Sequence, residues 1–551
     1  MAEKPNPKKP SSDYSASAAY WNMVSSILNG VESLRVVGLA SRASVAGPAQ
    51  PVGLLSQLGR NRRARGNTGS PYLPQFPNEQ DDIYELRLKH APLTNVYADI
   101  SRNLASRPFA KECELDEGEP EDLKKLTENI DGQGNNLHVF ARDMFKAAID
   151  KGIAWVLIDY NKADAKMTLA DERAAGIAPY WVAIPAERLL AIYSAFVGGV
   201  EVITHARIYE CTIEPRGYDE TEVERVREFN RAPLIDAYGK TAGYEPAEWK
   251  LHELQTTKDA KGKEQTDWVV VDGGPVSIGI IPMVPFIAGK RRGASWRVDP
   301  PIKDIAYMQI EEFQQESNLK SIKEMTAFPM LSGNGVPPPK DAQGNDIVIP
   351  VGPRAVLFAP PNADGSSGSW AFIEPQATSL TFLKSDLEAL RNEMRDLGMQ
   401  PLTASNLTVV TTKNLSLKAH SAVQAWAIGL KDALEQAFII TAKWMGQDLQ
   451  PVVKVHTDFD IEQDGAPQLD ALLKAEAQGV LSKATVQEEF KRRGVLSDEF
   501  DPAEEALALA DQQQGMQGEQ PIDPATGLPV GGSPMQANKK YIDNGQGLVL
   551  A

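Results

Sequence analysis

The pattern of hydrophobic and polar positions predicts two long helices on either side of a loop-rich insert. Apolar residues at helical spacing cover 300–328, which opens with a double proline suited to the first turn of a helix. The middle of this segment is polar on most faces. Such a helix fits packing against copies of itself or bridging solvent, and an ordinary surface helix fits the periodicity equally well.

A second helix is predicted over 379–398, where leucines and a methionine repeat at three and four residues up to Gly398, at the expected C-cap. The insert between the two helices, 329–378, is rich in Gly, Pro, Ser and Asn. Small polar and β-branched residues at 399–414 predict a break, and a third helix follows over 415–446. At about 1.5 Å per residue, this third helix would be roughly 45–50 Å long.

The half of the chain before these helices indicates the α+β class. Residues 71–299 carry several helix and strand patterns, including a mostly apolar strand at Ile153–Tyr160 that we expect to be buried. Between 211 and 270 the strand candidates are irregular, and they surround a charged run from Asp219 to Arg231.

Both ends of the chain are poor in core residues. We interpret 1–70 as a partly disordered N-terminal extension with one amphipathic segment and an arginine cluster, Arg60–Arg65, which more often marks a solvated loop than a phosphate contact. The third helix and a following strand occupy 415–466, and shorter helices are predicted within 467–511. Residues 512–551 are rich in Gln, Gly and Pro and are expected to be disordered.

Composition and charge narrow the classes of function. The 551 residues suffice for two to four domains of roughly 100–200 residues each. A net charge of −17 argues against tight, static binding of nucleic acid, although it is compatible with nucleic acid that slides past, and acidic soluble proteins are common. No apolar run is long enough to predict a membrane span, and the N-terminus lacks the apolar core of a signal peptide.

The residues that could carry chemistry form no catalytic pattern. The six histidines have no metal-site spacing, and Cys113 and Cys211 are too few for a disulfide framework. Asp131-Gly132-Gln133-Gly134 lacks the lysine of a phosphate loop and predicts a turn before a capped helix. Residues 460–465 open like a calcium loop, but Ala471 stands where its final carboxylate is due. We therefore predict no catalytic residue, no metal and no cofactor.

The order and spacing of the elements over about 71–500 resemble the portal proteins of tailed bacteriophages. The arginine-rich stretch before Pro71 departs from that pattern. The local motifs that carry the resemblance are the YLP at 72–74, the stretch from Asp131 to Tyr160, Pro179-Tyr180-Trp181-Val182, Ile281-Pro282 before the double proline, and Trp444-Met445-Gly446.

The resemblance implies a portal-type fold, in which about twelve copies form a ring with a central channel. The parts implied are an α+β wing at 71–299, stem helices at 300–328 and 379–398, a small α/β clip at 329–378, a tunnel loop at 399–414, a long wing-crossing helix and strand at 415–466, and a helical crown side at 467–511.

The resemblance also implies where DNA passes. Twelve copies at −17 each would carry about −200, and acidic channel walls would keep DNA from being trapped. Lys413 is the only cation of the implied tunnel loop, and we expect it to be the strongest DNA contact or, equally, part of an ion pair between subunits. The implied DNA-facing residues are Ser405, Asn406, Thr408, Thr411, Thr412, Lys413 and Asn414, and the implied stem residues at a subunit interface or the channel are Gln309, Glu312, Glu316 and Lys320.

By this resemblance the protein is a non-enzymatic channel at one capsid vertex, through which double-stranded DNA is packaged and ejected. The implied partners are further copies in a dodecamer, double-stranded DNA bound non-specifically, the terminase large subunit, the head-tail adaptor, and the major capsid protein and scaffold, with no membrane. The implied location is the virion, after assembly in the host cytoplasm. Two alternatives stay open: a cytoplasmic enzyme with a site in the α+β half, within 131–210, and a minor virion protein of the capsid interior.

Overall fold

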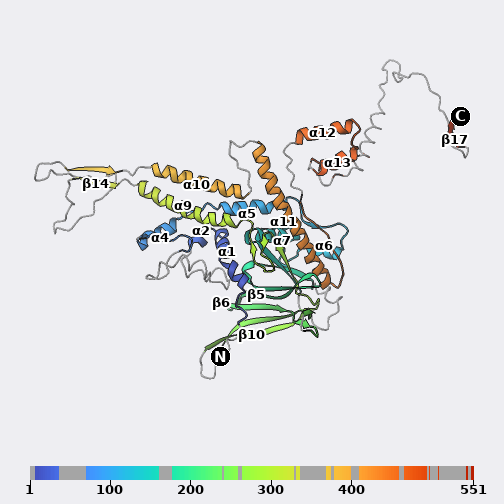
Figure 1. Cartoon of the computed structure of the whole chain (residues 1–551), viewed down its shortest axis with the longest axis horizontal. Helices are drawn as coiled ribbons and strands as arrows, with labels where there is room; N and C mark the ends of the chain where they lie inside the picture. Colours follow the sequence, from blue (N-terminus) through green and yellow to red (C-terminus); the bar gives the residue numbers. More distant parts are fainter. Residues whose placement is uncertain are drawn as a thin grey trace, which may run out of the picture. The chain divides into compact units, whose positions relative to one another are not determined.

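A computed structural model describes residues 6–35, 70–77, 79–160, 177–238, 241–258, 264–327, 330–334, 368–373, 378–398, 409–457, 465–492, 495–496, 500, 505, 507, 541–543 and 548–550. The chain divides into two compact units, Met1–Phe459 and Asp460–Ala551. The described residues combine helices with antiparallel sheets, which confirms the predicted α+β class (Figure 1). Every described helix is too short or too polar to cross a lipid bilayer.

The amphipathic segment near the N-terminus forms helix α1, Ser12–Leu28, which is followed by α2, Val31–Arg35. The hydroxyl of Ser11 accepts a hydrogen bond from the backbone N–H of Tyr14 and caps the start of α1. The Tyr14 hydroxyl in turn donates to the backbone carbonyl of Glu187 at 2.9 Å. Both helices contribute to the main hydrophobic core of the first unit.

Helix α1 confirms the amphipathic segment predicted within 1–70, and the structure adds that this segment is part of the core. Val24 and Ile27 are fully buried, and Trp21 donates its indole N–H to the backbone carbonyl of Lys151 at 3.1 Å. An amphipathic helix buries its apolar face against whatever surface fits it. Here that surface belongs to residues more than a hundred positions away, which a local pattern cannot reveal. The arginine cluster Arg60–Arg65 lies outside the described residues.

Three layers make up the centre of the first unit. A three-stranded antiparallel sheet in the order β11-β2-β3 has helices α7 and α11 on one face and the five-stranded sheet on the other. The central strand β2 is buried along most of its length, as its apolar sequence predicts. The elements of these layers are α7, Leu137–Lys151; α11, Val409–Trp444; β2, Ile153–Tyr160; β3, Pro179–Ile184; and β11, Met283–Ile287.

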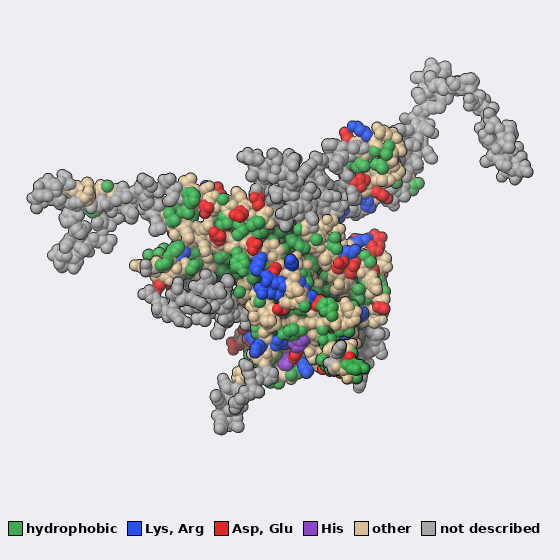
Figure 2. Space-filling view, viewed as in Figure 1, with side chains coloured by type: hydrophobic (Ala, Val, Ile, Leu, Met, Phe, Trp, Pro, Cys, Tyr) green, Lys and Arg blue, Asp and Glu red, His purple; other side chains and the backbone are tan. Residues whose placement is uncertain are grey.

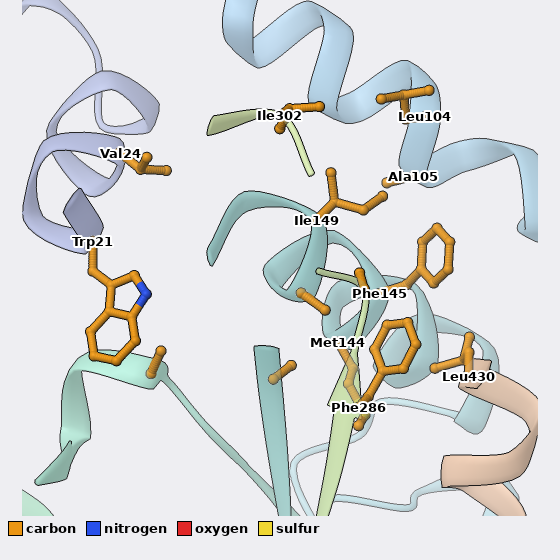
Figure 3. Close-up of a cluster of buried hydrophobic side chains, with 14 of the residues drawn as sticks. Trp21, Val24, Leu104, Ala105, Met144, Phe145, Ile149, Phe286, Ile302 and Leu430 are labelled. Atoms are coloured by element: carbon orange, nitrogen blue, oxygen red, sulfur yellow. The ribbon is translucent and has the colours of Figure 1, made fainter. Parts of the chain in front are cut away.

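The core between the helices and the three-stranded sheet is built from aromatic and aliphatic side chains (Figure 3). Phe145 of α7 stacks on Phe286 of β11, with ring centroids 5.6 Å apart. Leu430 of α11 lies beside them, and Met144 completes the group in the view of Figure 3. This packing positions α11 across the body.

Most of the irregular region between 211 and 270 belongs to a five-stranded antiparallel sheet in the order β10-β9-β6-β5-β4. The charged run that starts at Asp219 is a strand, because its charges pair across the sheet: Arg225 bonds Glu253 and Glu214, each at 2.8 Å. The strands are β4, Leu189–Val197; β5, Val200–Arg216; β6, Asp219–Asn230; β9, Glu248–Lys258; and β10, Glu264–Pro275.

Smaller elements complete the body. The helices are α4, Asp81–His90; α5, Val96–Ser106; η2, Arg107–Phe109; α6, Glu121–Glu128; and η3, Ala186–Arg188. Two-stranded pairings join β1, Glu114–Leu115, to β16, Val453–Lys454; β7, Pro233–Ile235, to β8, Thr241–Tyr244; and β12, Lys290–Arg291, to β13, Val298–Asp299.

Both long helices beside the insert are present. They are α9, Lys303–Ala327, and α10, Thr378–Leu397, which lie side by side (Figure 1). Within the insert, β14, Met330–Asn334, pairs antiparallel with β15, Ser369–Ile373, next to the ends of the two helices. The strand pattern predicted around 347–358 lies outside the described residues.

The third long helix begins earlier than predicted. Helix α11 starts at Val409, so the predicted break over 399–414 is wrong for its last six residues. All four residues from Val409 to Thr412 are β-branched, and a run of such residues led to the prediction that the helix starts later. Each such residue costs less than about 0.7 kcal/mol in a helix, so four of them do not end a helix of this length.

The second unit contains α12, Gly465–Ala477, and α13, Lys483–Arg492. The Ser482 hydroxyl accepts from the backbone N–H of Thr485 at 3.2 Å, which confirms the predicted cap. Near the end of the chain, β17, Tyr541–Asp543, pairs with β18, Leu548–Leu550. The prediction that 512–551 is disordered throughout is therefore wrong for these strands, because backbone pairing needs no large core.

Candidate functional site

Helix α10 packs on α9 through the apolar stripe that the sequence predicts. Leu387 and Met394 are buried, while Leu383 and Leu390 on the same side are half-buried. Most other positions of α10 are exposed. Helix α10 therefore buries one narrow face against its own chain, and most of its remaining surface is exposed to solvent.

A buried polar cluster connects α9 to the start of α5. The amide of Gln309 is fully buried, and its Oε1 accepts from the backbone N–H of Tyr97 at 2.9 Å. Its Nε2 donates to the carbonyl of Thr94 at 3.1 Å and to Oε2 of Glu312 at 2.9 Å. Because every polar atom of this amide has a partner inside the chain, the cluster fixes α9 against the body.

The same cluster extends to α10 through Arg391. Its Nε donates to Oε1 of Glu312 at 2.9 Å, and its guanidinium also lies 2.9 Å from Oε1 of Glu316. Burial raises the pKa of Glu312 to about 7; hydrogen bonds from Arg391 oppose this rise, and the charge of Glu316 adds to it. Two carboxylates therefore share one cation at the junction of the two helices.

These contacts correct part of the predicted interface. Gln309 and Glu312 are fully buried within a single chain, so they face neither a neighbouring subunit nor a channel. The sequence pattern predicted an exposed face for this polar run, because the residues that contact Gln309 and Glu312 in the structure lie more than 70 positions away along the chain. Glu316 and Lys320 are half-buried, and their role at an interface stays a prediction.

The predicted tunnel-loop residues divide into two groups. Ser405, Asn406 and Thr408 lie outside the described residues. Thr411, Thr412, Lys413 and Asn414 belong to the first turns of α11 rather than to a loop. Their contact with DNA stays a prediction.

A groove of about 230 Å³ runs between α9 and α10, and sequence reasoning missed it. Four cationic side chains and two carboxylates line it. The only signal in the sequence is the seven-residue spacing of two of its cations on one side of α10. The charged lining residues are Lys320, Lys323, Lys384, Arg391, Glu316 and Glu388.

Two residues of the α+β half that sequence analysis considered for chemistry, Asp131 and Cys113, have environments that the structure explains. Burial alone would raise the pKa of Asp131, but hydrogen bonds from Asn135 and the backbone of Gln133 lower it, and this carboxylate closes the predicted turn. Asn136 then caps α7, as predicted. Burial raises the pKa of the Cys113 thiol to about 12, which makes it a poor nucleophile. Within the described ranges, no group of three or more His, Cys, Asp or Glu side chains could hold a metal ion.

Comparisons with known proteins match part of the chain to one family model and match the chain to a number of solved structures. Residues 301–445, from α9 to α11, match a family described as "Domain of unknown function (DUF4055)". No curated protein matches the chain. A chain in the "Neck of native GTA particle computed with C12 symmetry" is 11% identical, with a TM-score of 0.37, covering 71% of this chain and 88% of that one. A chain in the "Neck of empty GTA particle computed with C6 symmetry" is 12% identical, with a TM-score of 0.38, covering 73% and 90%.

Proposed function

We propose that the chain is a portal protein of a tailed-bacteriophage-like particle. Copies of the chain form a ring in the head-tail connector region, at one capsid vertex, and double-stranded DNA passes through the ring during packaging and ejection. The ring docks the terminase large subunit during packaging and the head-tail adaptor afterwards. The protein itself performs no chemistry, and the ring contains about twelve copies.

The observation that carries this proposal is the arrangement of α9, β14, β15 and α10. Two long helices leave an α+β body and return to it, with a small two-stranded sheet next to their ends. The chain then continues into the 36-residue helix α11, which packs across the three-stranded sheet. This is the order expected for a wing, a stem, a clip, a second stem helix and a long helix across the wing.

Burial supports assembly as well. Helix α10 packs one narrow stripe against the core of its own chain. Its remaining surface includes the side chains of Phe382, which is 70% exposed, and Leu397, which is 51% exposed. Such a surface is typical of a helix that packs against another molecule.

The overall charge fits passage of DNA rather than its capture. A net charge of −17 for each chain gives a ring with strong negative potential, which weakens non-specific binding of phosphate. DNA can then move through the channel without a deep electrostatic trap.

The experiment is negative-stain electron microscopy of the purified chain, with mass photometry on the same sample. We expect rings with a central hole and a mass of about twelve chains. Monomers or dimers that persist across salt and protein concentrations would overturn the proposal. In that case the described residues of the α+β half become the place to search for a bound ligand.

A further inference from the structure

Helix α10 carries a second stripe, which lies about a quarter turn around the helix from its buried leucines. The stripe consists of Phe382, Asp386, Ala389, Glu393 and Leu397, which we call the outer stripe. Steps of three and four residues place all five on one side of the helix. All five are exposed. In Figure 2, acidic and hydrophobic side chains lie together over the region of α9 and α10.

Among the residues that the structure describes, the acids of the outer stripe have no counter-charge within ion-pair distance. Asp386 and Glu393, and Asp396 beside them, form no ion pair with any described residue. By contrast, the acids of the α9 cluster share Arg391. An exposed helix stripe that combines unpaired acids with large apolar side chains fits a partner surface that is basic and partly apolar.

The lysine groove between α9 and α10 is such a surface. It contains Lys320, Lys323 and Lys384, together with the apolar side chains of Leu319 and Leu387. The Glu388 carboxylate offsets Lys384 only weakly, because the two groups are 3.8 Å apart and both are more than 60% exposed. The lining residues of the groove comprise four cationic side chains and two carboxylates, which is an excess of positive charge.

The outer stripe and the lysine groove lie on opposite sides of α10. Asp386 follows Lys384 by two residues, and Glu393 follows Arg391 by two. At 3.6 residues per turn, two residues turn the helix by about 200°. The same helix pair therefore presents an acidic, apolar side and a basic side that face away from each other.

We propose that the outer stripe of one copy docks in the lysine groove of the next copy. This contact rests on the proposed function, because a contact between two different sides of identical chains repeats head to tail and closes only in a ring. Phe382 and Leu397 become buried at the contact, and Asp386 and Glu393 pair with lysines of the groove. Nucleic acid does not fit the outer stripe, because its carboxylates repel phosphate.

The test reverses the charges of the outer stripe in one variant and those of the lysine groove in another. The stripe variant carries Asp386→Lys and Glu393→Lys, and the groove variant carries Lys323→Glu and Lys384→Glu. We expect each variant alone to lose its rings at about 0.1 M salt, where charges within about 10 Å still interact. An equimolar mixture should regain rings in which the two variants alternate, so that every ring has an even number of copies. Mass photometry and electron microscopy measure both effects.

Two controls accompany the test. A variant with Asp122→Lys and Glu128→Lys changes the same number of charges at exposed positions of α6, and it should assemble like the original chain. Recovery of rings in the mixture shows that both variants are folded. A single chain carrying all four changes should also assemble, because its stripe and groove are complementary again.

The outcomes separate this contact from the proposed function. If the original chain forms no rings, the proposed function and the contact both fail. If it forms rings and both variants do so equally well, or if the mixture recovers none, the contact is wrong and the portal proposal stands. If the groove variant assembles normally but loses affinity for duplex DNA, the groove is a phosphate site, and the contact is likewise wrong.

Discussion

At the scale of single residues, this protein buries polar side chains where its sequence looks most exposed. The run from Gln309 to Glu316 lies on a long helix, yet Gln309 and Glu312 are fully enclosed. Each buried polar atom in the Gln309 amide has a partner from a different part of the chain. Such clusters fix geometry, because any other packing of the helices would leave these groups unpaired.

Replacing Glu312 by Gln should remove a pH dependence of stability. Burial raises the pKa of Glu312 from 4.5 to about 7, so in this window the folded chain holds a proton that the unfolded chain has released. The contribution is complete below pH 4.5 and is lost as the pH rises to 7. Relative to the variant, the original chain should lose about 1–3 kcal/mol of unfolding free energy over this window, measured by urea unfolding.

The control for this prediction is Glu311→Gln on the exposed side of the same turn. It should leave the pH profile of the original chain unchanged. Equal slopes in all three proteins would mean that Glu312 stays ionised when folded.

A second residue-scale prediction concerns the contact between β3 and α11. The indole N–H of Trp181 donates to the Thr441 hydroxyl at 2.9 Å, and both side chains are fully buried. Thr441→Val keeps the shape but leaves the N–H without an acceptor, which should cost about 1–3 kcal/mol of unfolding free energy. Thr441→Ser keeps the acceptor and should cost less. Urea unfolding of the two variants measures the loss of unfolding free energy in each. Equal losses would contradict the role of the hydrogen bond.

At the scale of elements, the close approach of α10 to α5 depends on one glycine. The position of Gly398 suggests a helix C-cap from sequence. In the structure the contact matters more, because a Cβ at this position would lie 2.6 Å from Cγ2 of Ile100. Gly398 thus allows the end of α10 to pack directly on α5, next to the polar cluster that joins both helices to α9.

Replacing Gly398 by Ala should therefore destabilise the body by about 1–3 kcal/mol, as other overpacked cores are destabilised. Ile100→Ala removes the side chain that the new methyl group would meet. In that background, the added cost of Gly398→Ala should fall to nearly zero, as measured by a double-mutant cycle in urea. Strictly additive costs would show that the glycine acts through its backbone instead.

At the scale of the whole molecule, the proposed ring would have to hold and release DNA in spite of its acidic charge. Lys413 lies in α11 rather than in a loop, so in the proposed ring it would repeat once in each copy, in the first turns of that helix. We expect Lys413→Ala to leave ring formation intact and to reduce the retention of duplex DNA. Each phosphate contact that is lost should reduce the slope of log affinity against log salt by about 1, and the substitution removes the lysine from every copy of the ring.

The matched control is Lys443→Ala, at an exposed position near the other end of α11. It should change neither rings nor DNA retention. If Lys413→Ala weakens the ring and leaves DNA retention alone, Lys413 pairs with a neighbouring subunit. If it changes neither, both roles of Lys413 are wrong.

The sequence alone determined the features that depend on near neighbours. The leucine spacing of α10, the turn at Asp131 with the cap at Asn136, and the buried strand β2 all follow from local chemistry. The α+β class follows from the same patterns. Each of these features needs only residues within a few positions of one another.

The tertiary structure decided the features whose partners are distant in sequence. It placed α1 in the core, made a strand of the charged run at Asp219, and enclosed Gln309 and Glu312. It also brought lysines of α9 and α10 to one groove. A polar or amphipathic stretch shows what it can bury or pair with, but only the folded chain shows which distant residue meets it, because burial and ion pairing depend on contacts in space.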